Sequence, residues 1–172
     1  AEAIEAILAV ARGRPRRPLV LRSHRGRGKT SALGLAATRV LEEGLGDVLV
    51  TAARREAVAP LFDRLAEATG ARTDDYGAVR VGRHRLRFLP PDVLLGQGPD
   101  PSSGARLLLI DEAAALPAAL LEALFTTFTR CVFATTEHGY EGSGRGFTLR
   151  FLPWLESLAA SVHHHWLTTP IR

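Results

Sequence analysis

The amino-acid sequence predicts an α/β fold in which a mostly parallel sheet is covered by helices on both faces. Short apolar segments such as Val48–Val50 and Leu107–Ile110 alternate along the chain with longer segments that carry apolar residues at helical spacing. Strands without an apolar–polar alternation are buried on both faces, which is typical of parallel sheets. The intervening helices supply the crossover connections that parallel strands require.

The first half of the chain is expected to hold three helices and two strands. The helices are indicated by their apolar periodicity and by breaking residues such as Gly44, which ends the second one. Pro60 lies early in the third helix or kinks it. The expected helices are Glu2–Ala11, Lys29–Glu43 and Arg54–Ala68, and the expected strands are Pro18–Arg22 and Asp47–Thr51.

The second half continues the alternation with less regular segments between the elements. Apolar and basic residues alternate around Gly82, which predicts a small hairpin or an added strand over Val79–Leu89. Trp154 and Trp166 are expected in the core. The other expected elements are the strand Arg106–Ile110, the helix Pro117–Phe128, the strand Cys131–Thr135, a strand near Trp166, and loops at Gly96–Gly104 and Gly139–Gly146.

Size and composition favour one soluble, cytoplasmic domain. The 172 residues are 46% hydrophobic and 23% charged, which suits a single buried core. No apolar run approaches the roughly 18–20 residues that cross a bilayer, and no secretory leader is evident. The one cysteine, Cys131, cannot form an internal disulfide. Because the sequence lacks methionine even at position 1, residues 1–172 are interpreted as a single domain that was processed or excised from something longer.

Basic residues are distributed unevenly, and all but one of them are arginine. Of 22 cationic side chains, the single lysine is Lys29. No acidic residue lies between Ala6 and Leu41, and a second acid-free stretch follows Val79. These stretches are either a solvated basic face with phosphate ligands or a track for a nucleic-acid backbone. The cationic residues concerned are Arg12, Arg14, Arg16, Arg17, Arg22, Arg25, Arg27, Lys29 and Arg39, then Arg80, Arg83, Arg85 and Arg87.

The segment Ser23–Thr30 carries a phosphate-binding pattern. It matches the P-loop pattern G-x-x-x-x-G-K-[ST] except that serine replaces the first glycine, a change that a negative φ tolerates. Because an apolar strand precedes it and a helix follows it, the backbone around Gly26 and Gly28 is expected to curl its N–H groups around phosphates. We expect Lys29 to reach the β- and γ-phosphates and the Thr30 hydroxyl to hold Mg²⁺.

Two adjacent acids, Asp111 and Glu112, supply the second half of such a site. They follow a strand that is apolar from Leu107 onward, which carries them to the carboxyl edge of the sheet, beside the P-loop. Asp111 is expected to contact Mg²⁺. Glu112 points elsewhere and is expected to act as the general base for the attacking water. The acid pair favours a RecA-like P-loop NTPase with one further strand between the P-loop strand and the acid strand.

Cys131–Thr135 is the natural candidate for that inserted strand. At its tip, Thr135 and Thr136 either sense the γ-phosphate or the water, or simply end the strand. In the glycine-rich loop that follows, Arg145 is expected to touch a phosphate of RNA or of the nucleotide.

Four runs of residues resemble the tRNA(Met) cytidine acetyltransferase family, and more narrowly its RecD-type helicase/ATPase module. They follow in order over nearly the whole chain and read RGRGKT at 25–30, IDEAAALP at 110–117, ATTEHGYEGSGRGF at 134–147 and TPIR at 169–172. The resemblance implies a modular enzyme that makes N4-acetylcytidine at the wobble position of elongator tRNA(Met). Such an enzyme uses acetyl-CoA in a separate acetyltransferase domain and hydrolyses ATP or GTP in the helicase-like one.

The resemblance also assigns nucleotide contacts. It implies that Arg172 contacts the nucleotide and that the P-loop residues Gly26, Arg27, Gly28, Lys29, Thr30 and Ser31 hold it. A glutamine upstream of the P-loop reads the nucleotide in this family, whereas the only glutamine here is Gln97. We therefore expect the sequence to begin just after that position and to act together with the remaining domains of the same enzyme.

These residues are compatible with three functions. The leading hypothesis is an ATPase module that couples nucleotide turnover to the positioning of a tRNA for base modification. One alternative is the motor lobe of a RecD-like helicase, although processive unwinding usually needs two RecA-like lobes. The other is a nucleotide-gated RNA-binding module without turnover, in which Glu112 is idle.

Overall fold

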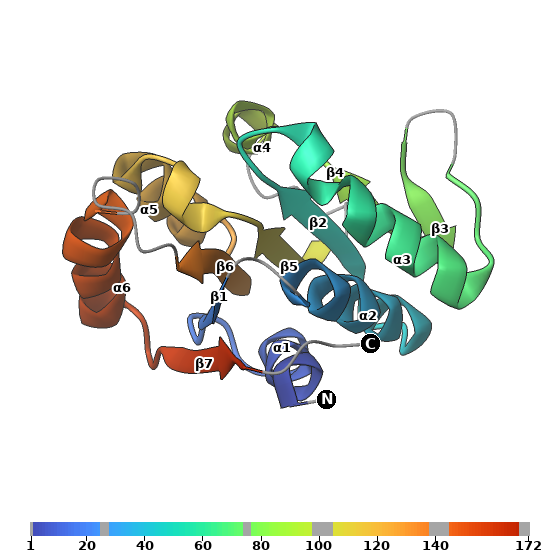
Figure 1. Ribbon diagram of the computed structural model, residues 1–172, viewed down its shortest axis with the longest axis horizontal. Coiled ribbons are helices and arrows are strands. Elements are labelled where there is room, and N and C mark those ends of the chain that lie inside the picture. Colours follow the sequence, from blue (N-terminus) through green and yellow to red (C-terminus); the bar gives the residue numbers. More distant parts are fainter. Residues whose placement is uncertain (1, 25–27, 74–76, 98–104, 138–144, 169–172) are drawn as a thin grey trace.

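The protein is a mostly parallel α/β sheet flanked by helices (Figure 1). The computed structural model describes all residues except 1, 25–27, 74–76, 98–104, 138–144 and 169–172. Within the described residues, one seven-stranded sheet has the order β3-β4-β2-β5-β6-β1-β7. Neighbouring strands are parallel except β3 and β4, which are antiparallel. The fold class predicted from the sequence is therefore confirmed.

The elements alternate along the chain as the apolar pattern indicates. The strands are β1 (Leu19–His24), β2 (Asp47–Thr51), β3 (Val79–Val81), β4 (His84–Phe88), β5 (Ala105–Ile110), β6 (Cys131–Glu137) and β7 (His163–Leu167). The α-helices are α1 (Glu2–Arg12), α2 (Lys29–Glu42), α3 (Ala59–Thr69), α4 (Pro91–Gln97), α5 (Ala118–Thr127) and α6 (Leu152–Leu158). The turns η1 (Arg55–Val58) and η3 (Ala113–Ala115) are 3₁₀-helical, and η4 (Gly146–Phe151) is π-helical.

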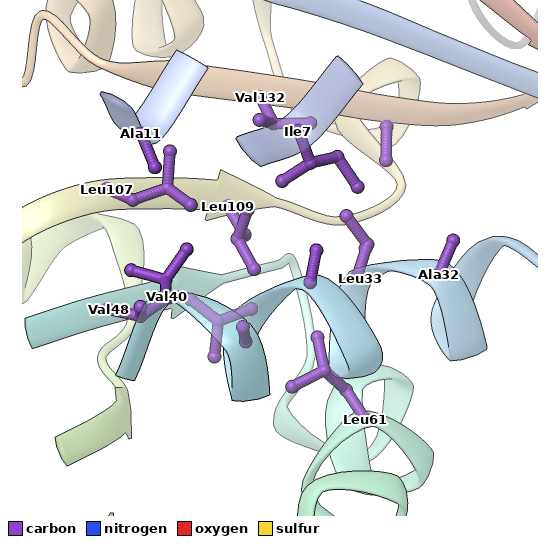
Figure 2. Close-up of a cluster of buried hydrophobic side chains, with 14 of the residues drawn as sticks. Ile7, Ala11, Ala32, Leu33, Val40, Val48, Leu61, Leu107, Leu109 and Val132 are labelled. Carbon is purple, nitrogen blue, oxygen red and sulfur yellow. The ribbon is translucent and has the colours of Figure 1, made fainter. Parts of the chain in front are cut away.

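Helices cover both faces of the sheet, with α1, α2 and α3 on one face and α5 and α6 on the other (Figure 1). Since successive side chains of a strand point to opposite faces, each central strand contributes side chains to two apolar clusters. In β5, Leu107 and Leu109 join the first cluster, and Leu108 and Ile110 join the second. Figure 2 shows side chains of α1, α2 and α3 gathered against this strand. Burial on both faces explains why these strands read as continuous apolar runs.

The inserted strand lies where the sequence places it. β6 stands between β5, which ends beside the acid pair, and β1, which leads into the P-loop. The carboxyl ends of β1, β5 and β6 therefore meet at one edge of the sheet. This edge carries the candidate site.

The prediction of a single helix over Arg54–Ala68 is wrong for its first turn. The structure has η1 up to Val58 and starts α3 at Ala59, with Pro60 in the first turn of that helix. Proline lacks an N–H and fixes φ near −65°, so it suits a helix start and opposes a helix that continues from the preceding residues.

The segment Val79–Leu89 forms a hairpin that also extends the sheet. β3 and β4 pair antiparallel, Gly82 turns between them with φ 63, and β4 pairs parallel with β2. The helix α4 was not expected, and it takes in the first residues of the loop expected over Gly96–Gly104. Residues 98–104 and 138–144 of the two expected glycine-rich loops lie outside the described residues.

One of the two tryptophans is not a core residue. Trp154 packs against the second apolar cluster, as expected. Trp166 is 40% exposed, so its expected burial is wrong. It lies on β7, an edge strand that pairs only with β1 among the described strands, and an edge strand leaves part of its side chains uncovered. No helix in the described part of the chain is long and apolar enough to span a membrane.

Truncating Leu33 should destabilise the fold. Leu33 lies on α2 and is fully buried among its neighbours in the first cluster. Replacing it with alanine therefore leaves a cavity that costs about 2–5 kcal/mol of unfolding free energy. Urea unfolding followed by circular dichroism measures this loss. Leu149→Ala is the control, because Leu149 is 72% exposed and its truncation should cost less than about 0.5 kcal/mol. Equal losses in the two variants would contradict the core described above.

Candidate nucleotide site

The described residues on either side of 25–27 agree with the P-loop pattern, since β1 ends at His24 and α2 begins at Lys29. Gly28 precedes α2 with φ 82 and ψ −20, a left-handed conformation that glycine adopts without strain. The helix begins at Lys29, and Thr30 and Ser31 lie in its first turn. The free N–H groups and the positive dipole of a helix N-terminus favour an anion at this position.

Ser23, which replaces the first glycine of the pattern, fits its strand. It is fully buried near the end of β1 and pairs with Thr136 of β6. Among the described non-glycine residues, only Arg16 and Glu112 have positive φ. The negative φ that serine tolerates is therefore present.

Lys29 is the centre of the site. Its Nζ donates to Asp111 Oδ1 and to Glu112 Oε1, each at 2.5 Å. The side chains of Lys29 and Asp111 are 2% exposed, and that of Glu112 is 38% exposed. Removing a charge from water costs several kcal/mol, so a buried ammonium requires buried or half-buried carboxylates beside it. The two acids that the sequence predicts therefore meet the only lysine of the chain.

Glu112 reaches this position through an unusual backbone conformation. Its φ of 49 and ψ of 50 are left-handed, which costs a non-glycine residue about 1–2 kcal/mol. In this turn its N–H donates to Asp111 Oδ1 at 2.9 Å. Thr136 of β6 donates its hydroxyl to Glu112 Oε1 at 2.8 Å. The carboxylate of Glu112 is thus held by α2 through Lys29 and by β6 through Thr136.

The environment shifts the pKa values of the two acids in opposite directions. Burial raises the pKa of Asp111 above its usual value, against the opposing effect of the Lys29 charge. Burial also acts to raise the pKa of Glu112, but the hydrogen bonds and charge of Lys29, with the hydroxyl of Thr136, bring it below its usual value. Glu112 is therefore held as a carboxylate while the ion pair is closed.

Buried polar side chains gather at this edge of the sheet. They end β1, β2, β5 and β6 or begin α2, and they are Ser23, Lys29, Thr51, Asp111, Thr135 and Thr136. The hydroxyl oxygens of Ser23, Thr51 and Thr135 are buried without a hydrogen-bond partner among the described residues. Because an unpaired buried hydroxyl costs free energy, such groups suit a polar ligand. By strand alternation, Ser23 and Asp111 share the face that carries α2, and Thr51 and Thr135 lie on the opposite face.

These residues fit Mg²⁺ and a triphosphate. Mg²⁺ prefers oxygen ligands, and this edge of the sheet carries the carboxylate of Asp111, the unpaired hydroxyl of Ser23 and, in the first turn of α2, Thr30. Lys29 at the helix N-terminus matches the cation that P-loops direct at the β- and γ-phosphates. Since Lys29 pairs with both acids, the ion pair must open before the ammonium reaches a phosphate.

The structure brings together most of the residues that the sequence singled out, but not all. Lys29, Asp111, Glu112 and Thr136 are in direct contact, whereas the hydroxyl of Thr135 on the other face of β6 has no partner there. Arg145 is exposed where η4 begins. Gly26, Arg27 and Arg172 lie outside the described residues.

Sequence reasoning missed the hydroxyl of Thr51. Its only signal is that Thr51 is the last residue of an apolar strand next to β5, so its burial follows from the strand order. The left-handed conformation of Glu112 left no signal in the sequence, because glutamate is not a residue that favours it.

The family model for the RNA cytidine acetyltransferase NAT10/TcmA helicase domain matches residues 20–172. The chain belongs to this family. The match runs from β1 to the end of the sequence and so takes in all of the residues that form the candidate site. The resemblance drawn from the four sequence runs is confirmed at the level of the family.

Relatives from two bacteria agree along nearly the whole chain. The tRNA(Met) cytidine acetyltransferase TmcA of Nitrosococcus halophilus is 45% identical over 99% of this chain, which covers 22% of that relative. The protein of the same name from Vibrio cholerae is 43% identical over 99% of this chain, which covers 23% of that relative. The chain therefore spans less than a quarter of the length of these family members.

Solved structures with the same fold are distant in sequence. The large terminase of a thermophilic bacteriophage has a TM-score of 0.64 and 12% identity, over 96% of this chain and 45% of that chain. The large terminase ATPase domain of a Thermus phage has a TM-score of 0.52 and 15% identity, over 96% of this chain and 83% of that chain. This family module therefore has the fold of P-loop ATPases.

Removing the hydroxyl of Thr136 should raise the pKa of Glu112. Thr136 donates to the ionised carboxylate and so favours it, and Thr136→Val deletes that donor with little change in volume. A carboxyl carbon NMR titration of the nucleotide-free protein in a metal chelator measures the pKa. Thr135→Val is the matched control, since no hydrogen bond joins Thr135 to Glu112.

The same shift has a consequence for stability. A pKa lowered in the folded state contributes stability above the unfolded value of about 4.3, and this is lost as pH falls through the folded pKa. The Thr136→Val variant should lose less stability than the parent over that acidic window. An unchanged Glu112 pKa in Thr136→Val would contradict the contact.

Proposed function

We propose that this chain is the NTPase module of a tRNA(Met) cytidine acetyltransferase. It binds ATP or GTP with Mg²⁺, hydrolyses it, and couples turnover to positioning the tRNA for N4-acetylation of its wobble cytidine. The observation that carries the proposal is the meeting of Lys29, Asp111 and Glu112 at the N-terminus of the P-loop helix. Family membership supports the reaction in which the module takes part.

Each residue of the cluster has a role in the proposed hydrolysis. Lys29 leaves the carboxylates for the β- and γ-phosphates, aided by the N–H groups that begin α2. Asp111 and Thr30 hold Mg²⁺, which when bound neutralises charge on the phosphate oxygens. Glu112, once released, takes a proton from the water whose oxygen attacks the γ-phosphorus as the bond to the β-phosphate oxygen breaks. Thr136 keeps the Glu112 carboxylate in place through its hydrogen bond.

The other assigned residues and partners belong to the wider enzyme. Gly26, Arg27, Gly28 and Ser31 complete the phosphate-binding loop, and Arg172 contacts the nucleotide. Acetyl-CoA binds in an acetyltransferase domain elsewhere in the enzyme, and elongator tRNA(Met) is the partner. Arg145 is exposed where η4 begins, which suits a contact with RNA phosphate.

A second candidate is a nucleotide-gated RNA-binding module that does not turn over nucleotide. The ion pair between Lys29 and Glu112 favours it, because a carboxylate engaged by an ammonium is unavailable as a base. The two candidates differ in whether nucleotide binding frees Glu112.

Phosphate release from Mg–ATP and Mg–GTP, measured with and without elongator tRNA(Met), tests the proposal. Lys29→Ala should abolish release, because the phosphates lose their only buried cation among the described residues. Glu112→Gln should lower release by about 10²–10⁴-fold, the usual contribution of a general base. Nucleotide binding, followed by fluorescence of a labelled analogue, should survive in Glu112→Gln.

The controls separate the two candidates. Glu122→Gln removes an acid from α5, away from the cluster, and should leave release at the parent rate. Intact turnover in Lys29→Ala would refute the hydrolytic site. If Glu112→Gln changes tRNA binding in response to nucleotide but not phosphate release, the binding module is the correct function.

A further inference from the structure

The edge of the sheet opposite Lys29 concentrates arginines. Strand order places the amino ends of β5, β6 and β1 side by side, and each is accompanied by arginine. Arg106 lies at the start of β5, Arg130 directly before β6, and Arg16 in the turn before β1. Arg14 and Arg17 of the same turn are exposed. We call these five residues the arginine edge.

Backbone carbonyls, and not acids of the described residues, hold three members of the arginine edge, the half-buried Arg106 and Arg130 and the exposed Arg16. Arg106 Nε donates to Ala11 O at 2.6 Å, Arg130 Nε to Gly13 O at 3.0 Å, and Arg16 Nη2 to Leu158 O at 2.8 Å. A guanidinium has five N–H donors, so each retains further donors beyond this bond. Neutral carbonyls orient the groups, and no acid within the described part of the chain compensates their charges.

Five other described arginines form ion pairs with carboxylates. The pairs are Arg12–Glu43, Arg39–Glu5, Arg22–Glu137, Arg64–Glu67 and Arg85–Asp47. No carboxylate of the described residues forms an ion pair with any member of the arginine edge. Burial lowers the pKa of Arg130, and the nearby positive charge of Arg106 lowers it further. The fold thus holds like charges together at a cost in stability.

The turn that carries three of these arginines is fixed by the fold. Arg16 has a φ of 68, a conformation that is costly for a side chain of this size. Its N–H donates to Thr129 O at 2.9 Å, and its carbonyl accepts from the N–H of Ala160 at 2.8 Å. Backbone bonds on both sides therefore hold the turn in place between the loop before β6 and the loop before β7. A strained and fixed turn that displays cations is preorganised for an anion.

We propose that the arginine edge binds the phosphodiester backbone of RNA. Fixed guanidinium forks match phosphate oxygens in geometry and charge, and several neighbouring ones suit a polyanion more than a single small anion. The inference rests on the proposed function only in taking RNA as the partner. It places that RNA on the edge of the sheet away from the nucleotide, so both can be bound at once.

RNA binding in the absence of nucleotide tests the arginine edge. Fluorescence anisotropy with a labelled tRNA transcript is measured at several salt concentrations for the parent and for Arg14→Gln/Arg17→Gln. Neither side chain makes a hydrogen bond or ion pair in the described structure, so the fold should be retained, as thermal unfolding can check. Loss of two phosphate contacts should weaken binding about tenfold near 0.1 M salt and reduce the salt slope by about 2.

The matched control carries the same charge change on another surface. Arg54→Gln/Arg72→Gln removes two exposed arginines, one directly before η1 and one shortly after α3, and should keep parent affinity and slope. The proposal is overturned if this control loses the affinity and the arginine-edge variant keeps it. It is also overturned if polyglutamate competes as well as tRNA at equal charge, since the edge would then bind an acidic protein segment. Because no nucleotide is present, failed hydrolysis cannot produce either result.

Discussion

One buried ammonium organises the functional half of this fold. Lys29 enters from the first turn of α2 and meets two carboxylates at the end of β5, and the second of these is fixed to β6 by Thr136. A charge in the interior is tolerated only with opposite charge at contact distance. The position of the P-loop helix relative to two strands is therefore set by electrostatics as well as by apolar packing.

The same contacts pair the charged groups of the nucleotide-free site with one another. The groups that would face phosphate, metal and water are in contact, as the short distances from Lys29 to both acids show. A triphosphate must compete with Asp111 and Glu112 for the ammonium, and Mg²⁺ must compete with the ammonium for Asp111. Binding of either ligand alone leaves a charge uncompensated. The two ligands together supply an opposite charge to each partner, Mg²⁺ to Asp111 and the triphosphate to Lys29, which is why we treat them as a unit.

Parallel topology separates two kinds of charge on this molecule. The carboxyl ends of the strands bring acids, hydroxyls and a helix N-terminus to one edge. The amino ends bring arginines to the other edge, where the carbonyls of Ala11 and Gly13 near the end of α1 accept their hydrogen bonds. Cations are favoured at helix C-termini and anions at helix N-termini, so the direction of the helices supports both arrangements. The chain can present different surfaces to nucleotide and to a second anion.

The sequence alone determined the α/β class, the P-loop, the acid pair and the strand inserted between them. Burial on both faces and glycine-dependent turns produce local sequence patterns, which depend only on neighbouring residues. It identified Lys29, Asp111 and Glu112 by residue type and spacing. Tertiary structure decided that α3 begins at Ala59, that Trp166 lies on an exposed edge strand, and that Thr136 and not Thr135 contacts Glu112. It also decided the left-handed turn at Glu112 and the proximity of Arg106 and Arg130. Those outcomes depend on which strands become neighbours and which backbone groups they present, and contacts between residues far apart in the chain leave no local pattern.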